Sequence, residues 1–262
     1  MKLSFLTYNT LFNSGLENIE DILDIIKPDI ICLQEVDTAE KNLSRMSKFG
    51  YELAGYENSF IRLGIIYGIV TYYNKNIFKI KRHRWSIKKK GVDFLDVFYN
   101  VINIILRTGR QKSFLLSDLV HLKTNKEVTV CNTHLLVFGS NVLKMKHIEH
   151  LLKSLKLKKR QRFIISGDFN YFPYKRKGLE QLFLKYGLLE ATKDINQTVK
   201  FSGKKIISTF SLIQRLLIKL LHRVLRNLKV DYIFYKGVEL EDTKRIEVRF
   251  SDHYPIISVF KV

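Results

Sequence analysis

The alternation of apolar and polar residues predicts an α/β protein that starts with a strand–helix–strand unit. Lys2–Tyr8 alternates polar and apolar side chains, which is typical of a strand. Asn13 or Ser14 can cap a helix over Glu17–Ile26, where apolar residues recur at helical spacing. Asp29–Leu33 is an apolar run that predicts a fully buried strand. In such a unit the functional groups lie at the carboxyl ends of the strands.

Further apolar runs predict helices and strands along the rest of the chain. We expect three more helices, over Thr38–Phe49, Asn141–Leu157 and Lys177–Tyr186. We expect further strands over Tyr51–Tyr56, Gly68–Tyr73, Asp93–Leu106, Ser113–Leu122, Glu127–Asn132, Ile206–Phe210, Val230–Tyr235, Arg245–Phe250 and Pro255–Lys261. No linker rich in Pro, Gly or Ser divides the chain, so we predict one α/β domain over residues 1–262.

A short segment near the middle combines a buried strand with polar groups at its end. Phe163–Ile165 predicts the strand, and Gly167 permits a sharp change of direction. Asp168 and Asn170 are two residues apart, so in an extended segment their side chains point the same way. Two interpretations follow from these residues alone: a pair of catalytic groups, or a buried Asp–Asn pair that caps a turn.

Other predicted strands also end in, or contain, polar residues that folding can bring to one edge. The complete set is Asn9, Glu35, His134, Asp168, Asn170, Asp231, Asp252 and His253. Four converging carboxylates repel one another unless a cation neutralises them, and oxygen ligands favour Mg²⁺, Mn²⁺ or Ca²⁺ over Zn²⁺. Two imidazoles nearby can move protons or bind phosphate. The pattern predicts metal-assisted hydrolysis of a phosphate ester.

The excess of positive charge indicates which kinds of partner the chain can bind. With 45 Lys and Arg against 25 Asp and Glu, the formal net charge is +20, which favours polyanionic partners such as nucleic acid or an anionic membrane. A generally basic composition without such a role is the alternative. The basic run Lys79–Trp85, followed by Lys88–Lys90, indicates an exposed edge strand protected by lysines. A phosphate-contacting rim with Trp85 available for stacking is the second interpretation.

The segment Ser211–Lys229 has the pattern of a basic amphipathic helix. Its leucines form one helical face, whereas the opposite face carries basic and amide side chains and no acid. The pattern favours an outer helix packed on a sheet. The alternative is an element that contacts an anionic membrane or another polyanion.

The remaining composition indicates a cytoplasmic protein. Cys32 and Cys131 lie in apolar runs without metal-ligand spacing, which predicts reduced core residues in a reducing compartment. The N-terminus lacks the apolar segment of a signal peptide. No apolar run approaches the ~20 residues that a membrane span needs.

Six short blocks occur in the order found in the endonuclease/exonuclease/phosphatase (DNase I-like) superfamily, which this chain resembles from residue 8 to residue 255. They are Tyr8–Asn9, Leu33–Val36, Asn132–Leu135, Ser166–Asn170, Val230–Phe234 and Ser251–Pro255. The resemblance implies a four-layer α/β sandwich, with two face-to-face, mostly antiparallel β-sheets flanked by helices. It also implies a metal-dependent phosphoesterase that uses Mg²⁺, with Mn²⁺ as the alternative.

By the same resemblance, Glu35 is the principal metal ligand, Asn9 is hydrogen-bonded beside it, and Asp252 is a second metal contact, often through water. For Asn9 and Asn132, a buried polar residue held by hydrogen bonds is the plain alternative.

The catalytic roles also follow from the resemblance. Asp168 orients or deprotonates the attacking water, and Asn170 holds that water and a phosphate oxygen. Asp231 pairs with His253, which acts either as a base or as a cationic phosphate clamp. His134 contacts the phosphate or assists the leaving group.

Three functions remain open. The net charge favours a phosphodiesterase or nuclease that acts on nucleic acid. A phospholipid-directed phosphoesterase, sphingomyelinase-like or phosphoinositide-phosphatase-like, would use the Ser211–Lys229 helix to dock on an anionic membrane. An inactive binding module is the remote alternative, because all the expected polar positions are present.

Overall fold

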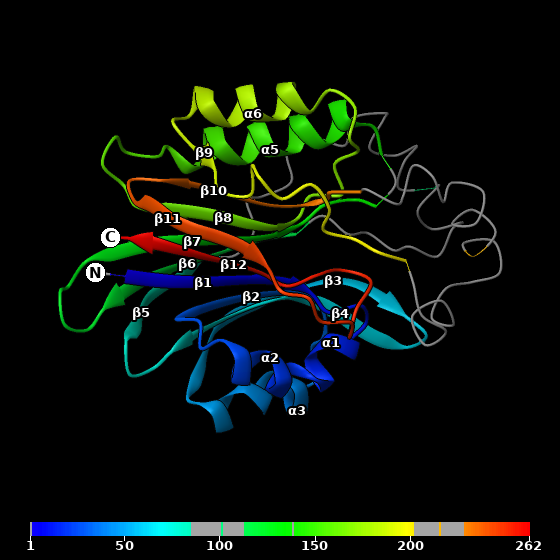
Figure 1. Ribbon diagram of the computed structural model, residues 1–262, viewed down its shortest axis with the longest axis vertical. Helices are drawn as coiled ribbons and strands as arrows, with labels where there is room; N and C mark the ends of the chain where they lie inside the picture. The colour runs from blue at the N-terminus through cyan, green and yellow to red at the C-terminus, as the bar shows by residue number, and fades with distance from the viewer. Residues whose placement is uncertain (1, 85–100, 102–112, 138, 202–214, 216–227) are drawn as a thin grey trace.

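The computed structural model describes residues 2–84, 101, 113–137, 139–201, 215 and 228–262 (Figure 1). The expected strands over Asp93–Leu106 and Ile206–Phe210 therefore lie outside the described residues, wholly or almost so. Trp85 with Lys88–Lys90, and nearly all of the expected Ser211–Lys229 helix, lie outside them as well.

Two six-stranded mixed sheets form the centre of the described structure. Sheet A has the order β11-β12-β1-β2-β4-β3, and sheet B has the order β5-β6-β7-β8-β10-β9. Their strands are β1 Lys2–Asn9, β2 Ile30–Asp37, β3 Tyr51–Arg62, β4 Ile65–Asn74, β5 Phe78–Arg84, β6 Ser113–His121, β7 Glu127–His134, β8 Phe163–Asp168, β9 Leu189–Glu190, β10 Asp231–Lys236, β11 Glu239–Arg245 and β12 Ile256–Lys261. Within them, β1 with β2 and β7 with β8 are parallel pairs, and the other neighbours are antiparallel.

Helices cover the outer faces of both sheets. The helical elements are α1 Ser14–Glu17, α2 Ile19–Ile25, α3 Glu40–Leu43, the 3-10 helix Ser44–Phe49, α5 Asn141–Leu155 and α6 Arg176–Lys185. Figure 1 shows α5 and α6 above sheet B and α1 to α3 below sheet A. Three apolar cores separate the layers: one between the sheets, around Phe5 and Ile164, and one under each helical layer. The expected four-layer sandwich is confirmed.

Two predicted helices are shorter than expected. The helix over Glu17–Ile26 is divided at Asn18, whose Nδ2 donates to the carbonyl oxygen of Ser14 at 2.9 Å and so ends the first turn early. In the helix over Thr38–Phe49, only four residues are α-helical before the chain tightens into a 3-10 helix. The hydroxyl of Ser47 donates back to the carbonyl oxygen of Ser44 at 2.6 Å, which fits this tighter turn.

The predicted strand over Arg245–Phe250 was wrong. The strand in this region is β11, which ends at Arg245, and residues 246–250 are not in a strand. Ile246, Val248 and Phe250 alternate with polar residues because they pack onto the core beneath sheet A, although the segment is not a strand. The edge strand β11 is largely charged and was missed for that reason. The two-residue strand β9 was also missed.

The end of the predicted basic helix needs a second correction. Leu228 and Lys229 are not helical, and both are buried. Lys229 Nζ lies 2.6 Å from Glu190 Oε1, so this lysine belongs to a buried ion pair and not to a polar helix face. Of the helix proper, Arg215 is described and is exposed.

Other expectations are met. β5 is an edge strand of sheet B, as the lysine-rich run predicted. Cys32 and Cys131 are buried, free cysteines. Among the described helices, none is long and apolar enough to cross a lipid bilayer.

Candidate functional site

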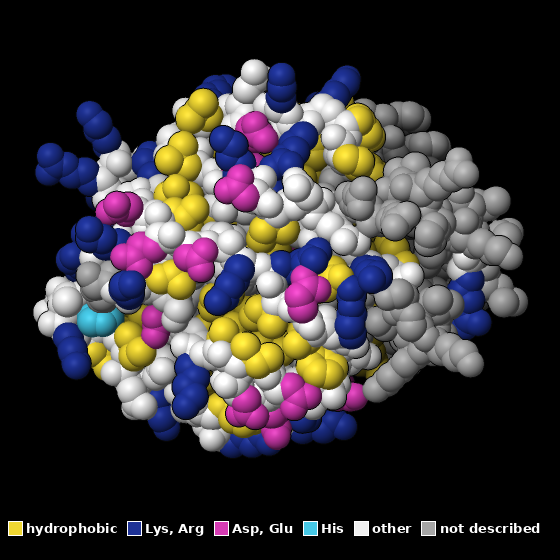
Figure 2. Space-filling model, viewed as in Figure 1, with side chains coloured by type: hydrophobic (Ala, Val, Ile, Leu, Met, Phe, Trp, Pro, Cys, Tyr) yellow, Lys and Arg dark blue, Asp and Glu magenta, His cyan; other side chains and the backbone are white. Residues whose placement is uncertain are grey.

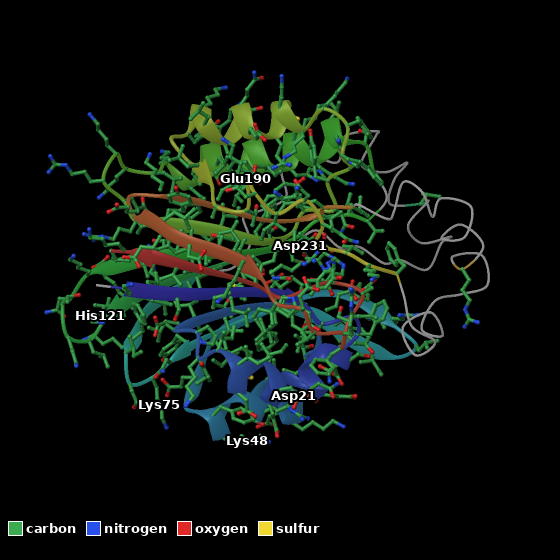
Figure 3. The ribbon with its side chains drawn as sticks, viewed as in Figure 1. Asp21, Lys48, Lys75, His121, Glu190 and Asp231 are labelled. Atoms are coloured by element: carbon green, nitrogen blue, oxygen red, sulfur yellow. The ribbon has the colours of Figure 1, made fainter. Side chains whose placement is uncertain are left out.

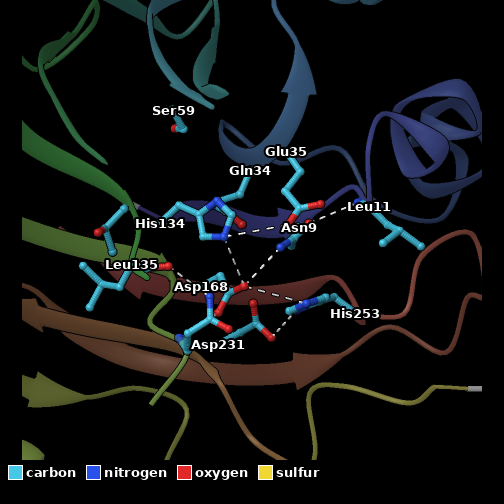
Figure 4. Close-up of polar contacts among 12 residues, drawn as sticks. Asn9, Leu11, Gln34, Glu35, Ser59, His134, Leu135, Asp168, Asp231 and His253 are labelled. Carbon is cyan, nitrogen blue, oxygen red and sulfur yellow. Dashed lines mark hydrogen bonds and ion pairs between the residues drawn. The ribbon is translucent and has the colours of Figure 1, made fainter. Parts of the chain in front are cut away.

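The carboxyl ends of the two parallel strand pairs meet at one edge of the sandwich. Asn9 and Glu35 lie at the end of the β1–β2 pair, and His134 and Asp168 are register partners at the end of the β7–β8 pair. Asp231 begins the antiparallel neighbour β10 opposite Asp168. Figure 4 shows these side chains converging between the sheets. The edge predicted from the strand ends is therefore where the polar groups gather.

Gly167 allows β8 to run close to β7 just before Asp168. Its φ is +136°, and a Cβ added there would lie 1.9 Å from the carbonyl oxygen of Thr133. Only glycine fits this position. The chain turns again at Asn170, which has a φ of 47°.

Asp168 and Asn170 form a turn as well as facing the site. The backbone N–H of Asn170 donates to Asp168 Oδ1 at 2.8 Å, and its side-chain Nδ2 donates to the carbonyl oxygen of Leu135 at 3.1 Å. These two hydrogen bonds are those of an Asp–Asn pair that caps a turn, so that interpretation is correct for part of the contacts of Asp168 and Asn170. The turn leaves Asp168 Oδ2 directed at the site.

Asp168 Oδ2 is the centre of the cluster. It accepts a hydrogen bond from Asn9 Nδ2 at 3.1 Å, and it lies 3.6 Å from His134 Nε2 and 3.8 Å from His253 Nε2. Burial raises the pKa of Asp168 to about 7, with His253 opposing the rise and Asp231 adding to it. A carboxyl group with a pKa near neutrality is suited to exchanging a proton with water.

A bulge in β2 delivers Glu35. The β2–β4 register shifts between Leu33 and Val36, and Glu35 has a left-handed φ of 56°. The loop after β1 wraps around the carboxylate, so that the N–H of Phe12 donates to Glu35 Oε2 at 3.3 Å. Asn9 supports this loop by accepting a hydrogen bond from the N–H of Leu11 at 3.0 Å.

His253 is held by Asp231. Its Nδ1 lies 2.8 Å from Asp231 Oδ2, which is the pair expected from the sequence. Burial alone would lower the pKa of His253, but Asp231 and Asp252 outweigh burial and raise it well above its usual value. The backbone N–H of Asp231 donates in turn to Thr198 Oγ1 at 3.1 Å. His253 is therefore poised as a cation beside Asp168.

His134 is the complementary, neutral imidazole. It is fully buried, and burial together with His253 lowers its pKa to about 3. Within the described part of the chain, neither ring nitrogen has a hydrogen-bond partner. Nε2 lies 3.8 Å from Glu35 Oε1, as well as close to Asp168. An unpartnered buried nitrogen aimed into the site is available to a ligand.

The carboxylates fit a divalent cation. Burial, with Asp252 and Asp168 adding to it, raises the pKa of Glu35 to about 8, and burial also raises that of Asp252. Such shifts mark buried negative charge that the protein compensates only in part. Among the described residues, donor atoms of Asp168, Asp231 and His253 lie within 4.8 Å of one another, a spacing that can hold a metal ion. The metal role of Glu35, Asp252 and Asn9 stays a prediction.

Asn132 is a buried polar residue held by hydrogen bonds, which was the alternative interpretation of this position. It is fully buried between the sheets, where its Nδ2 donates to the carbonyl oxygens of Leu33 at 3.0 Å and Val70 at 2.9 Å. Its Oδ1 accepts a hydrogen bond from Gln34 Nε2 at 2.8 Å. This residue joins the two sheets directly beneath the site.

Two residues that support the site from behind were not predicted from the sequence. Lys144 on α5 is fully buried, donates to the carbonyl oxygen of Asn170, and has its Nζ 4.2 Å from the Phe172 ring centre. Burial lowers its pKa to about 7, against the opposing charge of Asp168. Ser251 donates to the carbonyl oxygen of Asn9 at 2.8 Å. The only sequence signal for Ser251 is its place beside Asp252, and Lys144 gave none.

An aromatic wall with one cation lies beside Glu35 and His134. We define it as Phe12, Phe60, Arg62 and Tyr67. Phe60 stacks on Tyr67 with ring centres 5.4 Å apart, and it packs edge-to-face on His134 with ring centres 6.5 Å apart. The guanidinium carbon of Arg62 lies 3.7 Å from the ring centre of Phe12. The wall supplies ring surface and positive charge next to the carboxylates.

Two face-to-face sheets with a carboxylate–histidine site at one edge define a DNase I-like fold. The chain belongs to the Endonuclease/Exonuclease/phosphatase family, because the sequence model of that family matches residues 6–253. Members of this family are phosphoesterase hydrolases.

Solved structures agree with this assignment. An endonuclease/exonuclease/phosphatase from Bacteroides vulgatus has a TM-score of 0.71 at 14% identity, over 100% of this chain and 99% of that one. The human Nocturnin catalytic domain with bound sulfate has a TM-score of 0.70 at 16% identity, over 99% and 94%. D. rerio TDP2 complexed with single-strand DNA product has a TM-score of 0.65 at 12% identity, over 100% and 99%. No curated protein sequence matches the chain.

Proposed function

We propose that this protein is a Mg²⁺-dependent phosphodiesterase that hydrolyses nucleic acid. The observation that carries the hydrolase chemistry is the setting of Asp168 Oδ2, which lies between the amide of Asn9, the neutral His134 and the His253–Asp231 pair. The groups differ in charge although they share one buried site. Each can therefore take a separate role around a phosphate.

The protein groups divide the work as follows. Asp168 orients the attacking water and accepts its proton, for which a pKa raised to about 7 suits it. His253, charged through Asp231, binds a phosphate oxygen and stabilises the negative charge that develops on it. His134 offers its free nitrogen to the phosphate or to the leaving oxygen. Asn170 helps to hold the water and a phosphate oxygen.

Glu35 is the proposed principal ligand of the Mg²⁺, with Asp252 and Asn9 beside it and Mn²⁺ as the alternative ion. When bound, the ion supplies charge neutralisation at the phosphate. Its proposed place fits the raised pKa of Glu35, since a nearby cation would favour the ionised carboxylate.

Nucleic acid is the proposed substrate because of the surroundings of the site. The aromatic wall is half-exposed at Phe12, and the guanidinium of Arg62 covers that ring. Rings and arginines of this kind stack with bases of single-stranded nucleic acid. The net charge of +20 supports a polyanionic substrate. The single-strand DNA product in the similarly folded TDP2 complex is consistent with such a substrate.

A phospholipid-directed phosphoesterase is the second candidate, and one observation favours it. The tip of the β3–β4 hairpin, next to the aromatic wall, exposes four apolar side chains. They are Ile61 at 68%, Leu63 at 89%, Ile65 at 40% and Ile66 at 43%. An exposed apolar tip beside a basic site is suited to contact with a lipid surface. The Ser211–Lys229 segment would add basic charge to that contact.

A substrate panel separates the candidates. Single-stranded DNA, plasmid, RNA, sphingomyelin and phosphoinositides would be incubated with Mg²⁺, with EDTA and with the Asp168→Asn variant. Mg²⁺-dependent turnover of nucleic acid supports the first candidate, and turnover of lipid alone replaces it with the second. If nothing is hydrolysed, both enzymatic proposals fail and the inactive binding module is left.

The hairpin gives a second test. The variant Leu63→Ser/Ile66→Ser should lose binding to anionic liposomes if the lipid candidate is correct. The matched control is Ile25→Ser/Leu184→Ser, because these residues are 61% and 60% exposed on helices instead. Equal liposome binding by both variants removes the lipid candidate.

We also propose a cytoplasmic location. Both cysteines are free and buried, which suits a reducing compartment. Fractionation of cells that produce the protein checks this proposal.

A further inference from the structure

A cavity of about 740 Å³ lies on sheet B, away from the catalytic edge. Lys81 and Arg82 of β5 line one side of it, and the segment that follows α5, up to Arg162, lines the other. Thr129 of β7 contributes to its floor. Two basic runs that are 70 or more residues apart in the sequence therefore meet at one recess.

The cavity exists because α5 is too short to cover the outer face of sheet B. On β6, Leu116 points outward into the core beneath α5, and the next residue on the same face is Asp118. On β7, Cys131 likewise points into that core, and Thr129 is the next residue on the same face toward the cavity. Thr129 Oγ1 donates to Asp118 Oδ1 at 2.7 Å, so the uncovered part of the face is a polar floor. The helix itself ends at Leu155, on the rim.

The basic side chains of the cavity walls outnumber the acidic side chains that pair with them. Lys81 pairs with Glu127, and Arg82 lies 3.6 Å from Asp118. The remaining basic residues of the lining have no ion-pair partner among the residues that the structure describes: Lys156, Lys158, Arg160 and Arg162. Figure 2 shows Lys and Arg side chains projecting along the left-hand edge of the molecule, where the loop after α5 and the strand β5 lie in Figure 1.

We infer that this cavity binds the phosphodiester backbone of single-stranded nucleic acid and is a second contact for the substrate of the catalytic edge. Four cations without an ion-pair partner in the described part of the chain surround a polar floor, and they match closely spaced phosphates. The described residues of the lining include no aromatic side chain for base stacking, so the contact is independent of sequence. A lipid surface fits less well, because the cations line a recess and Leu155 is the only apolar side chain among its described lining residues.

The position of the cavity sets a minimum length for a ligand that reaches both places. Thr129 and His134 are five positions apart on β7, which corresponds to about 17 Å along a strand. In Figure 3, His121 at the end of β6 lies at the left of the molecule, and Asp231 of the catalytic edge lies nearer its centre. A stacked strand rises about 3.4 Å per nucleotide, so about five steps, or about six stacked nucleotides, span it.

The test compares two triple variants that lose equal charge. The cavity variant is Lys158→Gln/Arg160→Gln/Arg162→Gln, and the control is Lys27→Gln/Lys41→Gln/Lys244→Gln, at exposed lysines elsewhere. Fluorescence anisotropy in EDTA measures binding of a labelled 20-nucleotide single strand across a salt series. Hydrolysis with Mg²⁺ is measured on a tetranucleotide, which is too short to reach both places. Hydrolysis of bis-p-nitrophenyl phosphate with Mg²⁺ measures the catalytic edge alone.

For the 20-nucleotide strand, the cavity variant should bind roughly tenfold more weakly than the control, with a salt slope flatter by about 2, since each lost phosphate contact is worth about 0.7. Tetranucleotide hydrolysis and ester hydrolysis should stay at the control level. Equal binding by both variants would overturn the inference. A selective loss of binding to phosphoinositide vesicles, with the 20-nucleotide strand unaffected, would also overturn it and assign the cavity to lipid.

The inference rests on the proposed nucleic-acid function, but the two fail differently. If the 20-nucleotide strand binds through the cavity and is never cut, the proposed hydrolysis fails and the cavity contact stands. If the strand is cut and both triple variants bind it alike, only the cavity contact fails.

Discussion

Asn9 and Asp168, 159 positions apart in the sequence, are joined by a 3.1 Å hydrogen bond between sheet A and sheet B. The bond ties the end of β1 to the end of β8, so neither sheet alone contains a complete site. The amide donates to the carboxyl oxygen that faces both histidines. The packing of the two sheets therefore decides the geometry around Asp168.

The variant Asp168→Asn should lose roughly 10³-fold in kcat, because the amide cannot accept a proton from water. The side-chain volume is unchanged, so the unfolding free energy should change by only about 1 kcal/mol. Steady-state kinetics and thermal unfolding measure the two effects. The control is Asp24→Asn, at an exposed acid on α2, which should keep wild-type activity. Retained activity in Asp168→Asn would remove this residue from the chemistry.

Without metal, the protein should lose stability as the pH rises from 5 to 7. Glu35 and Asp168 have pKa values raised to about 8 and about 7, so in this range the folded state binds more protons than the unfolded state. Each carboxyl can then lower the unfolding free energy by up to about 1.4 kcal/mol per pH unit. Urea unfolding at each pH in EDTA measures the slope.

Mg²⁺ should reverse that trend, because it binds the ionised carboxylates. The rise in melting temperature on adding Mg²⁺ should be larger at pH 7.5 than at pH 5. Glu35→Gln should flatten the pH slope and reduce the gain from Mg²⁺, while Glu40→Gln, at an exposed acid, should change neither. If adding Mg²⁺ does not change the melting temperature at either pH value, the proposed metal site is contradicted.

Gly167→Ala should destabilise the fold by about 3 kcal/mol or more, because the added Cβ would overlap the carbonyl of Thr133. Gly64→Ala is the matched control. It also has a left-handed φ, +79°, but no atom lies within 4 Å of the added Cβ. The control should cost about 1 kcal/mol. Chemical denaturation of both variants measures the difference, and equal losses would mean that strain and not the close strand contact dominates.

Lys144→Met should lower kcat about tenfold with a smaller effect on KM. The variant removes the donor to the Asn170 carbonyl, so the turn that directs Asp168 loosens while the surface that meets the substrate is untouched. Lys153→Met, at an exposed lysine on the same helix, is the control. Unchanged kcat in Lys144→Met would restrict the lysine to a packing role.

Much of the fold was predictable because buried strands carry strong apolar signals. β2, β7 and β8 are almost wholly buried, and their positions follow from the sequence. The charged edge strand β11 lacks that signal. Residues 246–250, which follow it, are not a strand but have the alternating pattern of one, because Ile246 and Phe250 pack inward. Helix breaks at Asn18 depend on local side-chain hydrogen bonds that periodicity does not reveal.

The expected site residues were predictable for a different reason. Asp231 begins β10 and His253 lies just before β12, and both belong to recognisable blocks, so their convergence could be expected. Lys144 and Ser251 bind backbone carbonyls, and any strand or helix could present such a residue. The aromatic wall comes from a hairpin and a left-handed loop, and its contacts depend on tertiary packing.

The hydrogen bonds of Asn132 fix how far the two sheets can slide past each other. Gln34, which it binds, precedes Glu35, and Asn132 itself is two residues before His134. Any movement of sheet A past β7 would have to break three buried hydrogen bonds, two to β2 and one to β4, before it changed the spacing of Glu35 and His134. The single amide of Asn132, in an apolar interior, thus holds the two sheets in register. It thereby fixes the distance between Glu35, the proposed metal ligand, and the imidazole of His134, which is proposed to bind the phosphate.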